Sequence, residues 1–79
     1  MSNTPAISYK EVVEVAEYLG FIKRSHDGTS HVQFKNPITG AKATIPAYKE
    51  PYGHDLFASI CRQLGVTKKQ FFGIFKKVK

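Results

Sequence analysis

The sequence has little cysteine and no long apolar segment. Cys61 is its only cysteine, which excludes an internal disulfide and a zinc site built from cysteines. Its longest apolar runs are a few residues, whereas a helix that spans a bilayer needs about 20. No basic stretch followed by an apolar run opens the chain, so no secretion signal is expected. We therefore expect a cytoplasmic protein that has no membrane partner.

Acidic residues are also scarce, and they are unevenly distributed. The 79 residues include 12 Lys and Arg but only 6 Asp and Glu, which gives a formal net charge of +6. The first 20 residues are acidic, because they hold Glu11, Glu14 and Glu17 and a single base. The remaining 59 residues are strongly basic, which favours nucleic acid over membrane as a partner. A solubilising surface charge explains the same composition, so charge alone leaves both interpretations open.

Three helices are predicted, each with a recognisable boundary. Ser8 and Glu11 form a capping box at the start of the first helix, and Gly20 ends it. A second amphipathic helix ends at Gly65, and a short third helix follows a second capping box at residues 67–70. Apolar staple pairs flank the two boxes: Ile7 with Val12, and Val66 with Phe71. We expect one domain over residues 1–79, with residues 1–7 as a flexible lead-in.

Three short strands are predicted between the first two helices, over residues 21–25, 30–35 and 41–45. Turn residues separate the strands, and Pro46 is expected to end the third. We therefore expect an α+β fold in the order α-β-β-β-α-α, with a three-stranded antiparallel sheet and helices on one face. Strand alternation directs Val32 and Phe34 to the core. It leaves a wet, basic face that carries His31, Gln33, Lys35, Lys42 and Thr44.

Most familiar catalytic patterns are missing. Metal is not expected, because no H-x-x-x-H spacing or cysteine pair is present. There is no G-x-S-x-G element, and Cys61 falls in a helix near apolar residues, as a packing side chain would. His26 lies in a turn and His54 at a helix start, whereas His31 lies on the basic sheet face.

An imidazole on a basic face is compatible with RNA cleavage by internal transfer. The ribose 2′-OH attacks its own phosphodiester, so a protein needs to supply proton transfer and charge stabilisation only. Histidine can serve in either proton role near neutral pH. An exposed strand histidine is more often inert, however, so the residues themselves show compatibility and no more. A nucleic-acid-binding module without catalysis and a protein that docks an acidic partner remain open.

Several short motifs together resemble the HicA toxin family. They span about residues 9–75 and occur in the family's order and spacing: Gly20-Phe21, Arg24, Gly28-Thr29-Ser30-His31, Asn36-Pro37, Gly40, Thr44-Ile45-Pro46, Ile60-Cys61-Arg62-Gln63-Leu64-Gly65 and Phe71. The resemblance implies a fold like that of the double-stranded-RNA-binding domain. It also implies ribonuclease activity on messenger RNA, restrained by a HicB antitoxin that covers the active site. The run from Ala47 to Gly53 departs from the family pattern, in which a basic residue often follows the proline.

The resemblance assigns the family's catalytic histidine to His31, which follows the Gly-Thr-Ser element. We therefore interpret the chain as the toxin of a type II toxin–antitoxin system, a metal-independent endoribonuclease without a cofactor. His31 is its general base or acid, and Ser30 positions that histidine. The RNA-binding residues are Arg24, Gly28, Ser30, Lys35 and Lys42. The alternative is a non-catalytic nucleic-acid-binding module of the double-stranded-RNA-binding type.

Overall fold

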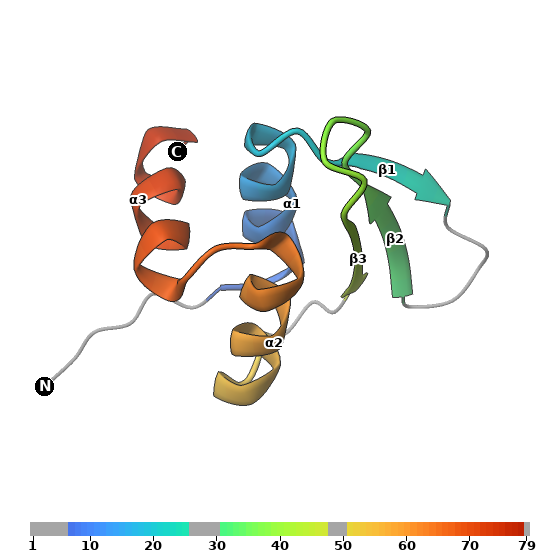
Figure 1. Ribbon diagram of the computed structural model, residues 1–79. Helices are drawn as coiled ribbons and strands as arrows, with labels where there is room; N and C mark the ends of the chain where they lie inside the picture. Colours follow the sequence, from blue (N-terminus) through green and yellow to red (C-terminus); the bar gives the residue numbers. More distant parts are fainter. Residues whose placement is uncertain (1–6, 26–30, 48–50, 79) are drawn as a thin grey trace, which may run out of the picture.

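Three helices and a three-stranded antiparallel sheet make up the part of the chain that the structure describes, residues 7–25, 31–47 and 51–78 (Figure 1). The structure is a computed structural model. Its elements are α1 (Tyr9–Tyr18), β1 (Ile22–Ser25), β2 (His31–Lys35), β3 (Lys42–Pro46), α2 (His54–Leu64) and α3 (Lys68–Val78). This order confirms the predicted α+β fold, and it is consistent with the double-stranded-RNA-binding type.

The helices lie on one side of the sheet, as predicted. In Figure 1, α1 stands between the sheet and α3, and α2 packs beside β3. The strand order is β1-β2-β3, so β2 is central and hydrogen-bonds to both neighbours. Buried side chains from every layer meet in one core, among them Val12, Val15, Phe34, Ile45, Ile60 and Phe71. The second face of the sheet carries none of these helices.

Both ends of α1 form as the sequence predicts. The Ser8 backbone N–H donates to Glu11 Oε1 at 2.9 Å and the Ser8 hydroxyl donates to the same oxygen at 2.5 Å. The hydroxyl hydrogen bond lowers the pKa of the Glu11 carboxyl. At the other end, Gly20 has φ +102°, and the Phe21 N–H returns to the Ala16 carbonyl.

Ile7 departs from the predicted flexible lead-in. Its side chain is buried, and its carbonyl accepts the N–H of Tyr52 at 2.8 Å. The staple prediction for the same residue explains why, because its partner Val12 lies in the core. Residues 1–6 lie outside the described ranges.

The third helix is longer than the short helix predicted. It has eleven residues and begins after Thr67, whose N–H donates to Gln70 Oε1 while the Gln70 N–H donates to Thr67 Oγ1. Phe71 is fully buried and meets the ring of Phe57 edge to face, with centroids 4.9 Å apart. This contact fastens α3 to α2, so tertiary packing extends the helix beyond what its short apolar stretch indicates.

The sheet has the alternation that the sequence predicts. Exposed and buried residues alternate along β2 and β3, and Val32 and Ile45 pair on the core side. β3 ends at Pro46, as predicted, and Pro46 is itself the last paired residue, opposite His31. A proline fits there because β3 is an edge strand, where a missing N–H costs the ladder least.

A buried asparagine joins α1 to the turn between β2 and β3. Asn36 is 4% exposed, and its Nδ2 donates to the Leu19 carbonyl at 3.0 Å. Its Oδ1 accepts the backbone N–H groups of Ile38 (2.9 Å) and Thr39 (3.3 Å). A Cβ on Gly20 would stand 3.3 Å from Asn36 Nδ2, so any other residue at this position would crowd the Asn36 amide. The Gly-Phe and Asn-Pro motifs therefore meet in one structural unit.

Asn36→Ala should lower the free energy of unfolding by about 1–3 kcal/mol, because it removes three part-buried hydrogen bonds to backbone groups. Thr39→Ala is the control in the same turn, since the Thr39 hydroxyl accepts only the exposed N–H of Ala41. Urea denaturation of both variants measures the difference. Equal stability of the two variants would show that the Asn36 hydrogen bonds contribute little.

Candidate active site

The exposed face of the sheet carries most of the residues that the sequence singles out. We call it the open face and define it by six exposed side chains: Arg24, His31, Gln33, Lys35, Lys42 and Thr44. Because strand side chains alternate, burial of Val32 and Phe34 against the helices directs their neighbours to this side. The parity predicted for these positions of β2 and β3 is confirmed.

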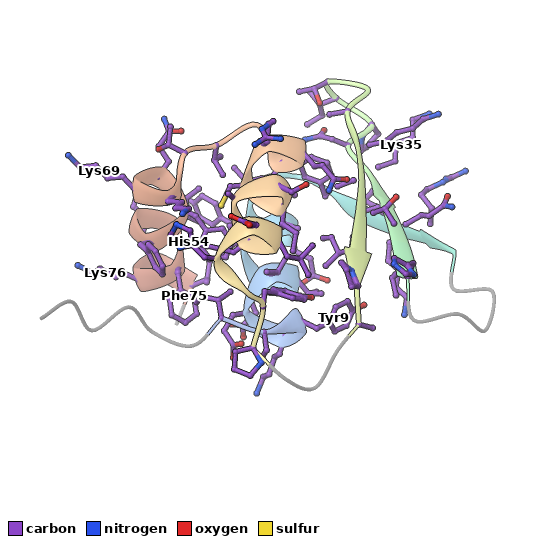
Figure 2. The ribbon with its side chains drawn as sticks, turned by 90° about the horizontal axis from the view of Figure 1, so that it is seen from below. Tyr9, Lys35, His54, Lys69, Phe75 and Lys76 are labelled. Carbon is purple, nitrogen blue, oxygen red and sulfur yellow. The ribbon has the colours of Figure 1, made fainter. Side chains whose placement is uncertain are left out.

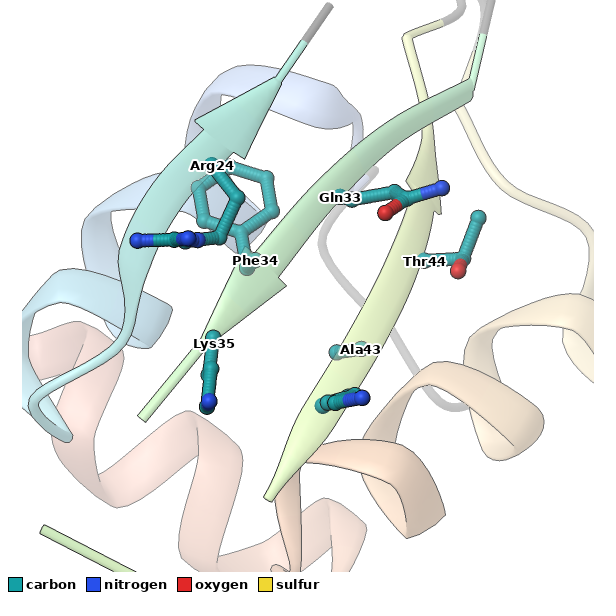
Figure 3. Close-up of a pocket in the computed structure, with 7 residues that line it drawn as sticks. Arg24, Gln33, Phe34, Lys35, Ala43 and Thr44 are labelled. Carbon is teal, nitrogen blue, oxygen red and sulfur yellow. The ribbon is translucent and has the colours of Figure 1, made fainter. Parts of the chain in front are cut away.

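A depression of about 310 Å³ lies on the open face (Figure 3). Figure 3 shows Arg24, Lys35 and Thr44 around it, on β1, β2 and β3 respectively. Lys42 and Gln33 also line it, with the buried Phe34 and Ala43. All three strands therefore contribute, and the predicted phosphate contacts Arg24, Lys35 and Lys42 do come together.

The charge in this depression is all of one sign. Lys35 and Lys42 are direct partners in the β2–β3 pairing. Arg24 joins them from β1, where the register shifts between Lys23 and Ser25, so that Arg24 is the extra residue of a bulge. The three strands contain no acidic residue. Two lysines directly opposite each other are unfavourable in a sheet, and such a local conflict is typical of a functional site.

His31 shares the open face with these cations but does not line the depression. It is the first residue of β2, opposite Pro46, whereas Lys35 is the last residue of β2. At about 3.3 Å per residue, the Cα atoms of the two lie about 13 Å apart. The structure thus separates the predicted proton-transfer residue from the predicted phosphate contacts. Gly28 and Ser30, the other predicted RNA-binding residues, lie outside the described ranges.

Gln63 supports the site in a way that the sequence reasoning missed. Its side chain reaches from α2 to the edge of the sheet, where Oε1 accepts the backbone N–H of Thr44 at 2.9 Å. This contact holds β3 against α2 and satisfies an outward N–H of an edge strand. A polar residue in the apolar surroundings of Ile60 and Leu64 was the available signal.

The remaining histidine and cysteine of the described residues lie elsewhere. His54 begins α2, and its Nε2 is 2.9 Å from Lys68 Nζ at the start of α3. Cys61 is buried, and burial raises the pKa of its thiol, which suits packing rather than nucleophilic attack.

The described residues are 7–25, 31–47 and 51–78. Within them, no three His, Cys, Asp or Glu side chains gather closely enough to bind a metal ion. None of the described helices has the length and apolar character that crossing a membrane requires.

Comparison with known protein families identifies the chain's family. A family model for the HicA toxin of bacterial toxin–antitoxin systems matches residues 9–66. The matched segment runs from the start of α1 past the end of α2, so it includes the whole sheet. The comparison with curated proteins found no match.

Lys42→Met should stabilise the fold by about 0.2–1 kcal/mol, because it removes repulsion between directly opposed lysines. The gain should shrink as salt is added, since salt screens exposed charges. Urea denaturation at low and high salt provides the measurement. Lys69→Met, on an exposed position of α3, is the control for loss of one positive charge. A destabilised Lys42→Met protein would contradict the proposed repulsion.

Proposed function

This chain belongs to the HicA toxin family of bacterial toxin–antitoxin systems, and we propose that it cuts messenger RNA as a metal-independent endoribonuclease. The observation that carries the proposal is the position of His31. It stands exposed on the open face, on the same strand as Lys35 and across the sheet from the helices. An imidazole beside a cationic surface can transfer protons at a phosphodiester that the surface binds.

The proposed reaction is attack by the ribose 2′-OH on the adjacent phosphorus. The bond from the 2′ oxygen to phosphorus forms as the bond from phosphorus to the 5′ oxygen breaks. A 2′,3′-cyclic phosphate and a free 5′-OH result. His31 either accepts the proton of the 2′-OH or donates one to the leaving 5′ oxygen, and water makes the other proton transfer. The strands carry no carboxylate that could hold magnesium at this face, which favours a route without metal.

The other predicted site residues bind the RNA or position His31 in this proposal. Arg24, Lys35 and Lys42 contact phosphates of the RNA backbone, as the charge of the depression supports. Gly28 leaves room for the backbone to approach, and Ser30 positions His31. These two assignments rest on the family motif.

The family also supports a protein partner. Because the chain belongs to a toxin–antitoxin family, we propose that a HicB-like antitoxin restrains it by covering the open face. Substrate and antitoxin would then compete for one surface in the cytoplasm, where messenger RNA is translated.

His31→Ala should reduce the rate of RNA cleavage by about 10²–10⁴-fold, the usual contribution of a general acid or base. Its stability should change by less than about 0.5 kcal/mol, since an exposed strand side chain packs little. His54→Ala is the matched control, because this histidine is exposed but lies on α2. Cleavage assays with purified proteins give the comparison. Equal cleavage rates for wild type and His31→Ala would refute the role of His31, and absence of cleavage by wild type would favour a binding module.

Cleavage should persist in excess EDTA and should stop when the 2′-OH at the cut is replaced by hydrogen or methoxy. The first result follows because His31 and the cations require no metal, and the second because the nucleophile is gone. Mass spectrometry of the fragments should detect the cyclic phosphate. Loss of activity in EDTA with recovery in magnesium, or normal cutting at a 2′-deoxy position, would contradict this reaction.

A further inference from the structure

The depression on the open face and His31 occupy different ends of the same strand. Lys35 and Lys42 lie at the end of β2 that leads to the Asn36 turn, and Arg24 lies level with Gln33 and Phe34, whereas His31 stands at the opposite end of β2. The Cα atoms of His31 and Lys35 are about 13 Å apart at the rise of a strand. A phosphate centred on the Lys35–Lys42 pair is therefore displaced along the strand from the imidazole.

The three cations form a site that an anion would stabilise. Lys35 and Lys42 face each other in the strand register, and the bulge of β1 adds Arg24 to the same depression. No carboxylate is available on these strands to neutralise them. Three cationic side chains around the depression suit a phosphate group, because charge-assisted hydrogen bonds are stronger than neutral ones.

The surface between the two ends is polar and neutral. Gln33 and Thr44, which also line the depression, are paired across β2 and β3 two residues along from the lysine pair, and both are exposed. An amide and a hydroxyl can bond to sugar hydroxyls and base edges but do not attract a phosphate strongly. Along β2 the open face thus runs from a proton-transfer end through a neutral middle to a cationic end.

We propose that the depression is a separate phosphate subsite, which holds the RNA backbone about two to four nucleotides away from the bond that is cut. A stacked strand advances about 3.4 Å per nucleotide, so about 13 Å corresponds to about four nucleotides, and an extended strand needs fewer. The inference rests on the proposed cleavage at His31. It implies that a dinucleotide is a poor substrate, because it cannot reach both ends of the face.

Binding of oligonucleotides of increasing length tests the subsite without cleavage. The probes are fluorescent 2′-methoxy oligouridylates of about two to eight nucleotides, measured by anisotropy over a range of salt concentrations. Wild type should gain affinity in a step once the probe spans the two ends. The double variant Lys35→Met/Lys42→Met should lose the step, and its salt slope should fall by about 0.7 for each lysine removed.

The control is a second double variant, Lys69→Met/Lys76→Met, which loses the same charge from α3. Both lysines are exposed and project away from the sheet (Figure 2). This variant should keep the length step. A step that is missing in wild type, or that both double variants lose equally, would overturn the subsite.

A cleavage experiment then locates the bound phosphate. The substrate carries one 2′-OH at the cut, 2′-methoxy groups elsewhere and a single neutral methylphosphonate that is moved along the strand. A methylphosphonate about two to four nucleotides from the cut should lower kcat/KM about tenfold in wild type, as loss of a charge-assisted contact does. It should have little effect in Lys35→Met/Lys42→Met. Sensitivity only at the cut, or equal sensitivity in both proteins, would overturn the inference.

The two proposals fail in different ways. If wild type does not cut RNA, while the length step is present and depends on Lys35 and Lys42, the nuclease proposal is wrong and the depression remains an RNA phosphate site. If His31-dependent cleavage occurs without a length step, the subsite is wrong and the nuclease proposal stands.

Discussion

The buried side chain of Asn36 is the interaction on which the arrangement of the open face depends. Its amide group holds the end of α1 through the Leu19 carbonyl, while its oxygen closes the turn that joins β2 to β3. The backbone N–H of Asn36 donates to the Ala41 carbonyl at 2.8 Å, which pairs the first residues beyond the two strands. One residue therefore fixes where β1 begins, where β2 ends and how β3 returns. The positions of Arg24, Lys35 and Lys42 follow from it.

Local sequence signals predicted much of this fold, since they act over a few residues. The two capping boxes and the glycines that end α1 and α2 need only i to i+3 or i+5 contacts. Strand parity assigned His31 and Lys35 to the exposed face for the same reason. Features set by distant contacts were missed: the hydrogen bond from Tyr52 to Ile7, the length of α3 and the reach of Gln63 to Thr44. No periodicity contains that information.

The candidate site, too, was predicted from the sequence only in part. Composition and the resemblance to HicA toxins named His31 and the three cations, and parity placed His31, Lys35 and Lys42 on one face. Their spacing required the strand register, because it is the pairing of Lys35 with Lys42 that gathers charge at one end. The sequence thus indicated what chemistry the face could carry but not that its parts are separated. Over the residues that the structure describes, every buried side-chain N or O atom has a hydrogen-bond partner, and such a scaffold can tolerate the repulsion of two opposed lysines.

The single cysteine has a consequence of a different kind. Cys61 is 2% exposed on α2, and burial disfavours its reactive thiolate form. A thiol reagent can modify it only after α2 has parted from the core, so the rate of labelling reports how often that opening occurs. Cys61 is therefore a natural probe of local unfolding, two residues from Gln63, which contacts β3. Labelling with and without RNA would tell whether a ligand on the sheet makes the helix beneath it more rigid.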